Sequence, residues 1–69
     1  MSEHYRHSGI ECIDAIEAAT EHLTGVEAFN VGNVIKYLWR YKFKNGKADL
    51  LKALDYLNKT IELNNEPTN

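Results

Sequence analysis

Four polar side chains recur at helical spacing in the middle of the chain: Asn33, Lys36, Arg40 and Lys44. Intervals of three, four and four residues place them in one wedge of a helix, because an α-helix turns about 100° per residue. An ammonium group supplies a point charge and a guanidinium a planar fork, and both suit phosphate oxygens. The spacing therefore predicts a phosphate-binding helix face, and the competing interpretation is a solvated basic surface.

A second candidate set is acidic and precedes the basic one. Glu11 and Asp14 are one helical turn apart, and Glu17 and Glu21 continue the same face. Two carboxylates at that spacing can share Mg²⁺, but a magnesium site normally needs further oxygen ligands. They could instead pair with basic residues of the same or a neighbouring chain. We therefore expect no metal site and a structural role for Glu11 and Asp14.

The N-terminal segment carries a third set of candidates. His4 could orient or protonate a phosphate oxygen, which makes it the candidate catalytic residue. Tyr5 could stack on a nucleobase, whereas we interpret His7 as part of a disordered tip. Cys12 falls on an apolar stripe and is expected in the core. The chain contains no Walker loop, no glycine-rich dinucleotide fingerprint and no zinc-ligand spacing.

Capping signals divide the chain into helices that would position these residues. Ser8 followed by Glu11 has the pattern of a capping box, which opens a first helix over about residues 9–22. A second capping box, residues 24–27, opens a helix that continues to about Phe43. No segment alternates between apolar and polar residues, so strands are not expected.

The second helix contains Gly32, which marks a kink, a close backbone approach or a later helix start. Residues 45–46, Asn-Gly, end this helix through a left-handed cap. A third helix is expected over about residues 47–63. Its apolar seam consists of Leu50, Leu54, Leu57 and Ile61.

The length of the chain bears on its assembly. With 69 residues and 7.9 kDa, it is shorter than most domains that are stable without a disulfide, a metal or self-association. Its single cysteine excludes an intramolecular disulfide and indicates a reducing, intracellular setting. Apolar residues around Trp39 and Tyr41 cover about twice the width that one packed neighbour needs. We expect an all-α, three-helix subunit, residues 1–63, that forms a homo-oligomer through the second helix, with a disordered polar tail at 64–69.

Charge and hydropathy limit the partners. The net charge is −2, so extended nucleic-acid binding is not expected. Residues 28–69 nevertheless hold seven bases against four acids, and a small positive region suits a compact phosphate. No apolar run is long enough to span a membrane and no signal peptide is recognisable. The expected location is therefore cytoplasmic, without a membrane partner.

Short motifs follow one another over residues 4–57: His4-Tyr5, Ile10-Glu11-Cys12-Ile13-Asp14, Phe29-Asn30-Val31-Gly32-Asn33-Val34-Ile35-Lys36-Tyr37-Leu38-Trp39-Arg40, Lys44-Asn45-Gly46, Asp49-Leu50-Leu51-Lys52-Ala53 and Tyr56-Leu57. In this order they resemble a small phage-encoded family, the SaV-like domain of unknown function. Its members are often labelled phage nucleotide kinase, and they include a nucleoside-monophosphate kinase that lacks a Walker motif. The resemblance implies a location in the cytoplasm of a bacterial host.

The resemblance also implies that the basic helix face binds a nucleotide. A kinase without a Walker loop would depend on cations around the transferred group, and Lys36, Arg40 and Lys44 could supply them. ATP or another nucleotide would be the ligand, and no further cofactor is firmly implied. Asp49, like Ser8, is expected to be a polar residue with a structural role. The alternatives are an oligomeric protein that sequesters a nucleotide or nucleotide-like host signal, and a Mg²⁺-dependent all-α nucleotide pyrophosphatase.

Overall fold

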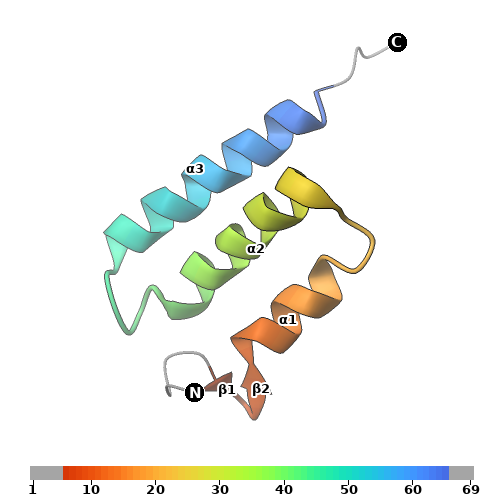
Figure 1. The fold of residues 1–69 in the computed structure, drawn as a ribbon. Helices are drawn as coiled ribbons and strands as arrows, with labels where there is room; N and C mark the ends of the chain where they lie inside the picture. Colours follow the sequence, from red (N-terminus) through yellow and green to blue (C-terminus); the bar gives the residue numbers. More distant parts are fainter. Residues whose placement is uncertain (1–5, 66–69) are drawn as a thin grey trace.

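Three helices make up most of the computed structural model, which describes residues 6–65 (Figure 1). A short antiparallel hairpin of β1 (Arg6–His7) and β2 (Ile10–Glu11) leads into α1 (Cys12–Ala19). Helices α2 (Gly25–Arg40) and α3 (Lys47–Leu63) follow. The three-helix architecture predicted from the sequence is confirmed, with the hairpin as an addition.

The hairpin stands where the sequence indicated a capping box. His7 pairs with Ile10 across the two strands, and the residues between them have positive φ angles, 54° at Ser8 and 80° at Gly9. Two positive φ angles in a two-residue loop are typical of a hairpin turn. Ser8 is therefore a turn residue, and the N-cap of α1 is Glu11, which makes no side-chain capping bond. The predictions of a helix from about residue 9 and of no strands were wrong here.

Helix α2 is the central element, with α1 along one side and α3 along the other (Figure 1). Helices α1 and α3 scarcely touch each other. The backbone of α2 comes close to α1 at Gly32, where an added Cβ would lie 3.2 Å from Cγ2 of Ile16. Of the three explanations for this glycine, the structure selects close approach. Cys12 of α1 is buried, which confirms its prediction as a core residue.

The connection between α2 and α3 is a hydrogen-bonded turn over residues 41–46. Helix α2 ends at Arg40, three residues before the expected end, and the amide of Gly46 donates to the carbonyl of Tyr41 at 2.8 Å. Gly46 has a φ of 52° immediately before α3, a conformation that favours glycine. The bounds of α3 match the predicted range of 47–63.

The far ends of α2 and α3 are also joined. Thr24 is the N-cap of α2, but its side chain makes no capping bond. The Glu27 carboxylate instead accepts a hydrogen bond of 2.6 Å from Nδ2 of Asn64. Helix α2 therefore begins where the second capping box predicted, but the Glu27 side chain bonds to Asn64 of α3's C-terminal end.

Helix α3 packs on α2 through a face that the hydrophobic pattern did not indicate. Its four residues that are not exposed are Asp49, Ala53, Tyr56 and Thr60. The predicted apolar seam points elsewhere, and its four side chains are 39–58% exposed. Among the described residues only Cys12 and Ala53 are fully buried hydrophobic residues, so a single layer of helices encloses little core. No described helix is long and apolar enough to cross a membrane.

Candidate functional site

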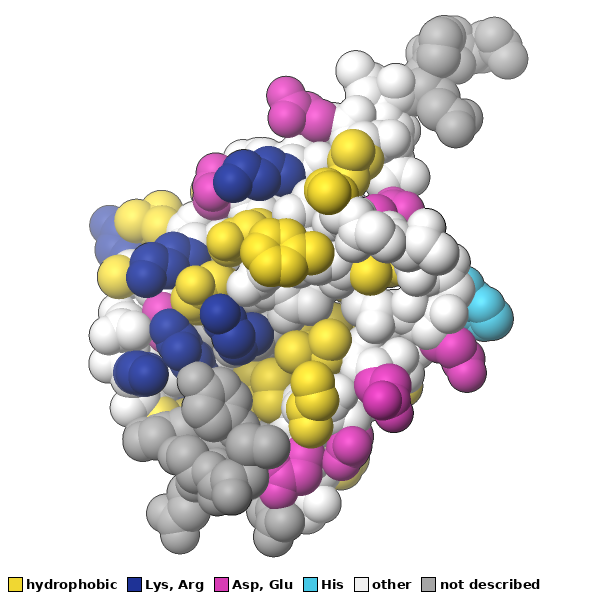
Figure 2. Space-filling view, in the orientation of Figure 1, with side chains coloured by type: hydrophobic (Ala, Val, Ile, Leu, Met, Phe, Trp, Pro, Cys, Tyr) yellow, Lys and Arg dark blue, Asp and Glu magenta, His cyan; other side chains and the backbone are white. Residues whose placement is uncertain are grey.

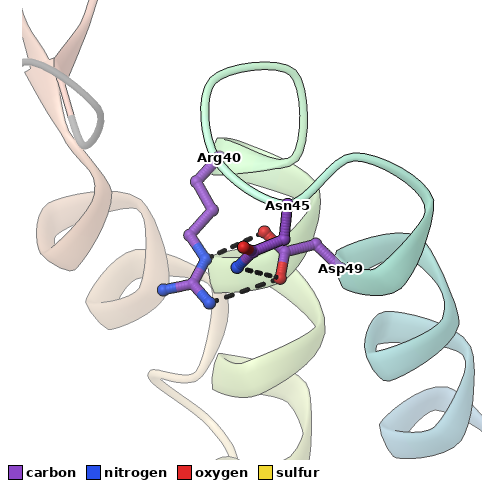
Figure 3. A network of polar contacts seen from close by, with 3 residues as sticks. All are labelled: Arg40, Asn45 and Asp49. Atoms are coloured by element: carbon purple, nitrogen blue, oxygen red, sulfur yellow. Dashed lines mark hydrogen bonds and ion pairs between the residues drawn. The ribbon is translucent and has the colours of Figure 1, made fainter.

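A buried polar network joins the end of α2 to the start of α3 (Figure 3). Nε of Arg40 donates to Oδ2 of Asp49 at 3.0 Å, and Nη2 donates to Oδ1 at 3.3 Å. Nδ2 of Asn45, from the connecting turn, donates to the same Oδ1 at 3.2 Å. Asp49 is 0% exposed. Because three donor groups converge on one buried carboxylate, the network fixes the relative position of the two helices.

This network sets the charge state of Asp49. The hydrogen bonds from Arg40, chiefly, and from Asn45 lower the pKa of the Asp49 carboxyl, although burial acts in the opposite direction. The positive charges of Arg40 and Lys52 lower the pKa further. The carboxylate is therefore ionised at neutral pH and balances the guanidinium.

Three cationic groups from α2 and α3 surround the ring of Tyr37. Nζ of Lys36 lies 4.3 Å from the ring centroid, Cζ of Arg40 lies 4.9 Å from it, and Nζ of Lys52 lies 5.5 Å from it. Attraction between a cation and an aromatic face helps to hold each group in place. The Tyr37 ring in turn stacks on Tyr56 of α3, with centroids 6.0 Å apart. We call Lys36, Arg40 and Lys52 the cation cluster.

Within residues 6–65, the cation cluster carries more positive charge than the neighbouring carboxylates neutralise. Asp49 pairs with Arg40, but no described carboxylate lies within ion-pair distance of Lys36 or Lys52. Figure 2 shows lysine and arginine side chains gathered on one face, beside exposed hydrophobic side chains. The ammonium groups of Lys36 and Lys52 both lie within 5.5 Å of the same ring centroid. Like charges repel one another, and this repulsion is relieved when an anion with several oxygens binds beside them.

An exposed aromatic ring lies further along the same face of α2. Phe29 is 60% exposed and packs edge-on against Tyr56, with centroids 5.8 Å apart. Lys36 follows seven residues later, which is two helical turns or roughly 10 Å along the axis. Asn33 lies between them, and its Nδ2 donates to the carbonyl of Phe29 at 2.9 Å. The face thus offers an apolar surface and a positive cluster on one side of the helix.

The structure brings together only some of the residues that the sequence predicted for the site. Asn33, Lys36 and Arg40 share the face, as helical spacing requires, but Lys44 lies in the turn after α2 has ended. His4 and Tyr5 lie outside the described residues. The sequence reasoning missed Lys52 because α3 alone does not reveal which of its faces packs on α2.

The N-terminal hairpin covers part of the aromatic surface of α2. His7 stacks on Trp39 with ring centroids 4.6 Å apart and planes 15° from parallel, and it contacts the edge of Phe43 at 5.6 Å. Nε2 of His7 and Nε1 of Trp39 are buried. The interpretation of His7 as part of a disordered tip was wrong, because the β1–β2 pairing holds it against α2. Trp39 is consequently less available for an oligomer interface than its position in the sequence indicated.

Glu11 and Asp14 lie where β2 leads into α1. Asp14 is exposed in the first turn of the helix, where a carboxylate is favoured by the helix dipole. Glu11 is half-buried where β2 meets α1. Within residues 6–65, no three His, Cys, Asp or Glu side chains are grouped so that they could hold a metal ion.

The chain was compared with models of known protein families. The family model described as a protein of unknown function (DUF3310) matches residues 1–58. The chain belongs to this family. The DUF3310 match covers β1 to α2 and most of α3, including the whole cation cluster, but its description carries no activity. The nucleotide-kinase label implied by the resemblance therefore stays a prediction. No curated protein and no solved structure matches the chain.

Proposed function

We propose that the protein binds a nucleotide on the face formed by α2 and α3. The observation that carries the proposal is the convergence of Lys36, Arg40 and Lys52 on the Tyr37 ring at 4.3–5.5 Å. The phosphate would occupy the cation cluster, and Phe29 would stack on the base. A basic stripe on one helix is common on protein surfaces, whereas three cations from two helices around one ring are a more specific arrangement.

The three cations would have different roles. Lys36 and Lys52 are partly exposed and have mobile ammonium groups, so they can close on phosphate oxygens. Arg40 has its Nε and Nη2 committed to Asp49, so it contributes chiefly positive charge and a fixed position. Lys44 is the fourth residue of the connecting turn, and its ammonium would approach the phosphate only from that side.

The spacing of the groups favours a mononucleotide over inorganic phosphate. Phe29 and Lys36 are roughly 10 Å apart along the helix axis, a length that a nucleoside mono- or diphosphate spans when the lysine side chain bends toward it. A free phosphate would use only the cluster. An extended nucleic acid would need a longer positive track than these residues provide.

Phosphoryl transfer to a nucleoside monophosphate is the activity that we propose for the bound nucleotide. Transfer without a Walker loop depends on positioning and on positive charge around the transferred group, and the cation cluster could provide both. Sequestration without turnover needs only the binding face and stays the alternative. A pyrophosphatase that uses Mg²⁺ on Glu11 and Asp14 is not favoured by any observation in the described residues.

Binding is tested by calorimetry with each deoxynucleoside monophosphate, ATP and inorganic phosphate. Lys36→Ala and Lys52→Ala should each weaken nucleotide binding about tenfold or more, since each removes one charge-assisted contact. Lys42→Ala is the matched control, because it removes one positive charge outside the cluster. Equal affinity of the parent, Lys36→Ala and Lys52→Ala would place the site elsewhere.

Arg40→Ala is less informative, because it leaves the Asp49 carboxylate buried without its main partner and perturbs the fold. Phe29→Ala should weaken nucleotide binding while leaving phosphate binding unchanged. If it weakens neither, the base does not lie on Phe29.

Turnover is tested with labelled ATP and each deoxynucleoside monophosphate, with and without EDTA. Formation of a labelled diphosphate supports the transferase. Tight binding without product contradicts it and supports sequestration. Release of pyrophosphate that EDTA abolishes contradicts both and supports the hydrolase.

We also propose that the subunit self-associates, with α2 contributing part of the interface. The support is the small core of the single helical layer.

A further inference from the structure

The apolar seam of α3 is a regular and exposed surface. Leu50, Leu54, Leu57 and Ile61 follow one another at intervals of four, three and four residues, the spacing at which helices pair along a seam. Their exposed fractions are 39%, 51%, 43% and 58%. The helix packs on α2 through a different face, so nothing in the described chain covers the seam.

The arrangement of the helices leaves a place for a second layer. Small domains normally enclose their core between two packed layers, but here α1, α2 and α3 form one layer (Figure 1). Leu38 of α2 is 49% exposed and lies about 160° around the helix from Lys36. It therefore belongs to the side of the layer opposite the cation cluster, which is also the side of the α3 seam.

We infer that this apolar side binds a second copy of the chain, with the two α3 helices antiparallel across a two-fold axis between Leu54 and Leu57. A two-fold axis at that point pairs Leu54 with Leu57 of the partner subunit, and Leu50 with Ile61 of the partner subunit. An interface of this kind is self-complementary and closes on two copies.

The distribution of charge selects the antiparallel direction. The start of α3 is basic, with Lys42 and Lys44 in the preceding turn and Lys47 as the first helical residue. Its end is acidic, with Glu62 in the last turn and Glu27 hydrogen-bonded to Asn64. Antiparallel pairing brings each basic end to the partner's acidic end. Parallel pairing would place like charges side by side at both ends, and it would align the helix dipoles unfavourably.

This interface is independent of the proposed nucleotide face. Lys52 lies roughly 170° around α3 from the centre of the seam. The dimer would therefore bury the apolar side and leave both cation clusters facing solvent. Failure of the nucleotide proposal would not affect this inference, and the reverse also holds.

The first test measures the mass of the full chain by sedimentation equilibrium. The parent chain should be a dimer at micromolar concentration. Leu54→Glu and Leu57→Glu should raise the dimer dissociation constant about 30-fold or more, as expected for residues at the centre of an interface. Leu63→Glu is the matched control, because it makes the same change on the same helix at similar exposure, 54%, but away from the seam. Circular dichroism checks the helicity of each variant.

The second test uses charge exchange and does not depend on a variant that could unfold. Lys47→Glu places an acid at the start of α3 and Glu62→Lys places a base at its end, so both changes favour the helix itself. Each single variant should weaken the dimer several-fold, and the double variant should recover it. Without recovery in the double variant, the antiparallel direction is wrong.

Two results would overturn the inference as a whole. A parent chain that remains a 7.9 kDa monomer at micromolar concentration means that the seam has another occupant, such as a different protein. An oligomer that survives Leu54→Glu but dissociates in Leu63→Glu means that the copies meet on the other side of the layer.

Discussion

Replacing Gly32 by alanine tests the close approach of α1 to α2. In an unobstructed helix, alanine is about 0.8–1.0 kcal/mol more favourable than glycine. Here the new Cβ would lie 3.2 Å from Cγ2 of Ile16, closer than ordinary van der Waals contact. Added volume in a packed contact costs about 1–3 kcal/mol. We therefore expect Gly32→Ala to reduce the free energy of unfolding by up to about 2 kcal/mol, in spite of the better helix propensity.

The same geometry predicts a specific rescue. Ile16→Leu removes the Cγ2 branch that the alanine would meet, and this exchange alone should cost less than about 1.5 kcal/mol. In the Ile16→Leu background, Gly32→Ala should be neutral or stabilising, because the propensity gain is no longer opposed. The coupling energy between the two positions should then be about 1–3 kcal/mol.

The assay is urea unfolding of the four proteins of this cycle, monitored by far-ultraviolet circular dichroism at one chain concentration. A fixed concentration is needed because self-association would contribute to the apparent stability. With an m value of about 1 kcal/mol/M for so small a chain, the expected loss shifts the midpoint by up to about 2 M. If Gly32→Ala stabilises the parent, or if the coupling is below about 0.5 kcal/mol, the inferred contact between α1 and α2 is wrong.

Three further predictions follow from buried or stacked side chains. Hydrogen bonds from Arg40 lower the pKa of Asp49 below its ordinary value of 3.8. Asp49 therefore stabilises the fold above that pH, and the contribution is lost as the pH falls through the lowered pKa. The Asp49→Asn variant should be less stable than the parent at neutral pH, and its urea midpoint should fall less steeply as the pH is lowered. A pH profile identical to that of the parent would contradict this. Burial raises the pKa of the Cys12 thiol, so a thiol reagent at neutral pH should react far more slowly with native than with unfolded protein, and equal rates would show that α1 is not docked. His7→Ala should uncover Trp39 and shift its fluorescence to longer wavelength, whereas an unchanged spectrum would mean that the stacked contact is absent in solution.

The elements that could be predicted depend on signals within a few residues. Helix α3 was predicted with its bounds, and Cys12 with its burial, because apolar periodicity is a local property. The hairpin at β1 and β2 was missed because Ser8-Gly9 fits both a capping box and a two-residue turn. Strand pairing with the preceding residues decides between them, and a two-residue strand has no periodicity to detect.

The part of the candidate site that lies on α2 could be predicted from the sequence. Asn33, Lys36 and Arg40 share a face because a helix repeats every 3.6 residues. Lys44 does not continue that face, since α2 ends at Arg40 and a turn follows. Lys52 could not be assigned from the sequence, because its position depends on how α3 is rotated against α2.

The sequence by itself determined the number of helices, the positions of their polar and apolar stripes and the spacing of the charges, because these follow from local periodicity. Only the tertiary structure decided which stripe of each helix is packed. In α3 the small Ala53 and the paired Asp49 face α2, while the leucines that the pattern favoured as the buried face remain exposed. The physical reason is that a small residue allows close helix contact and a carboxylate buried at the contact must be paired, and both depend on which residues the neighbouring helix presents.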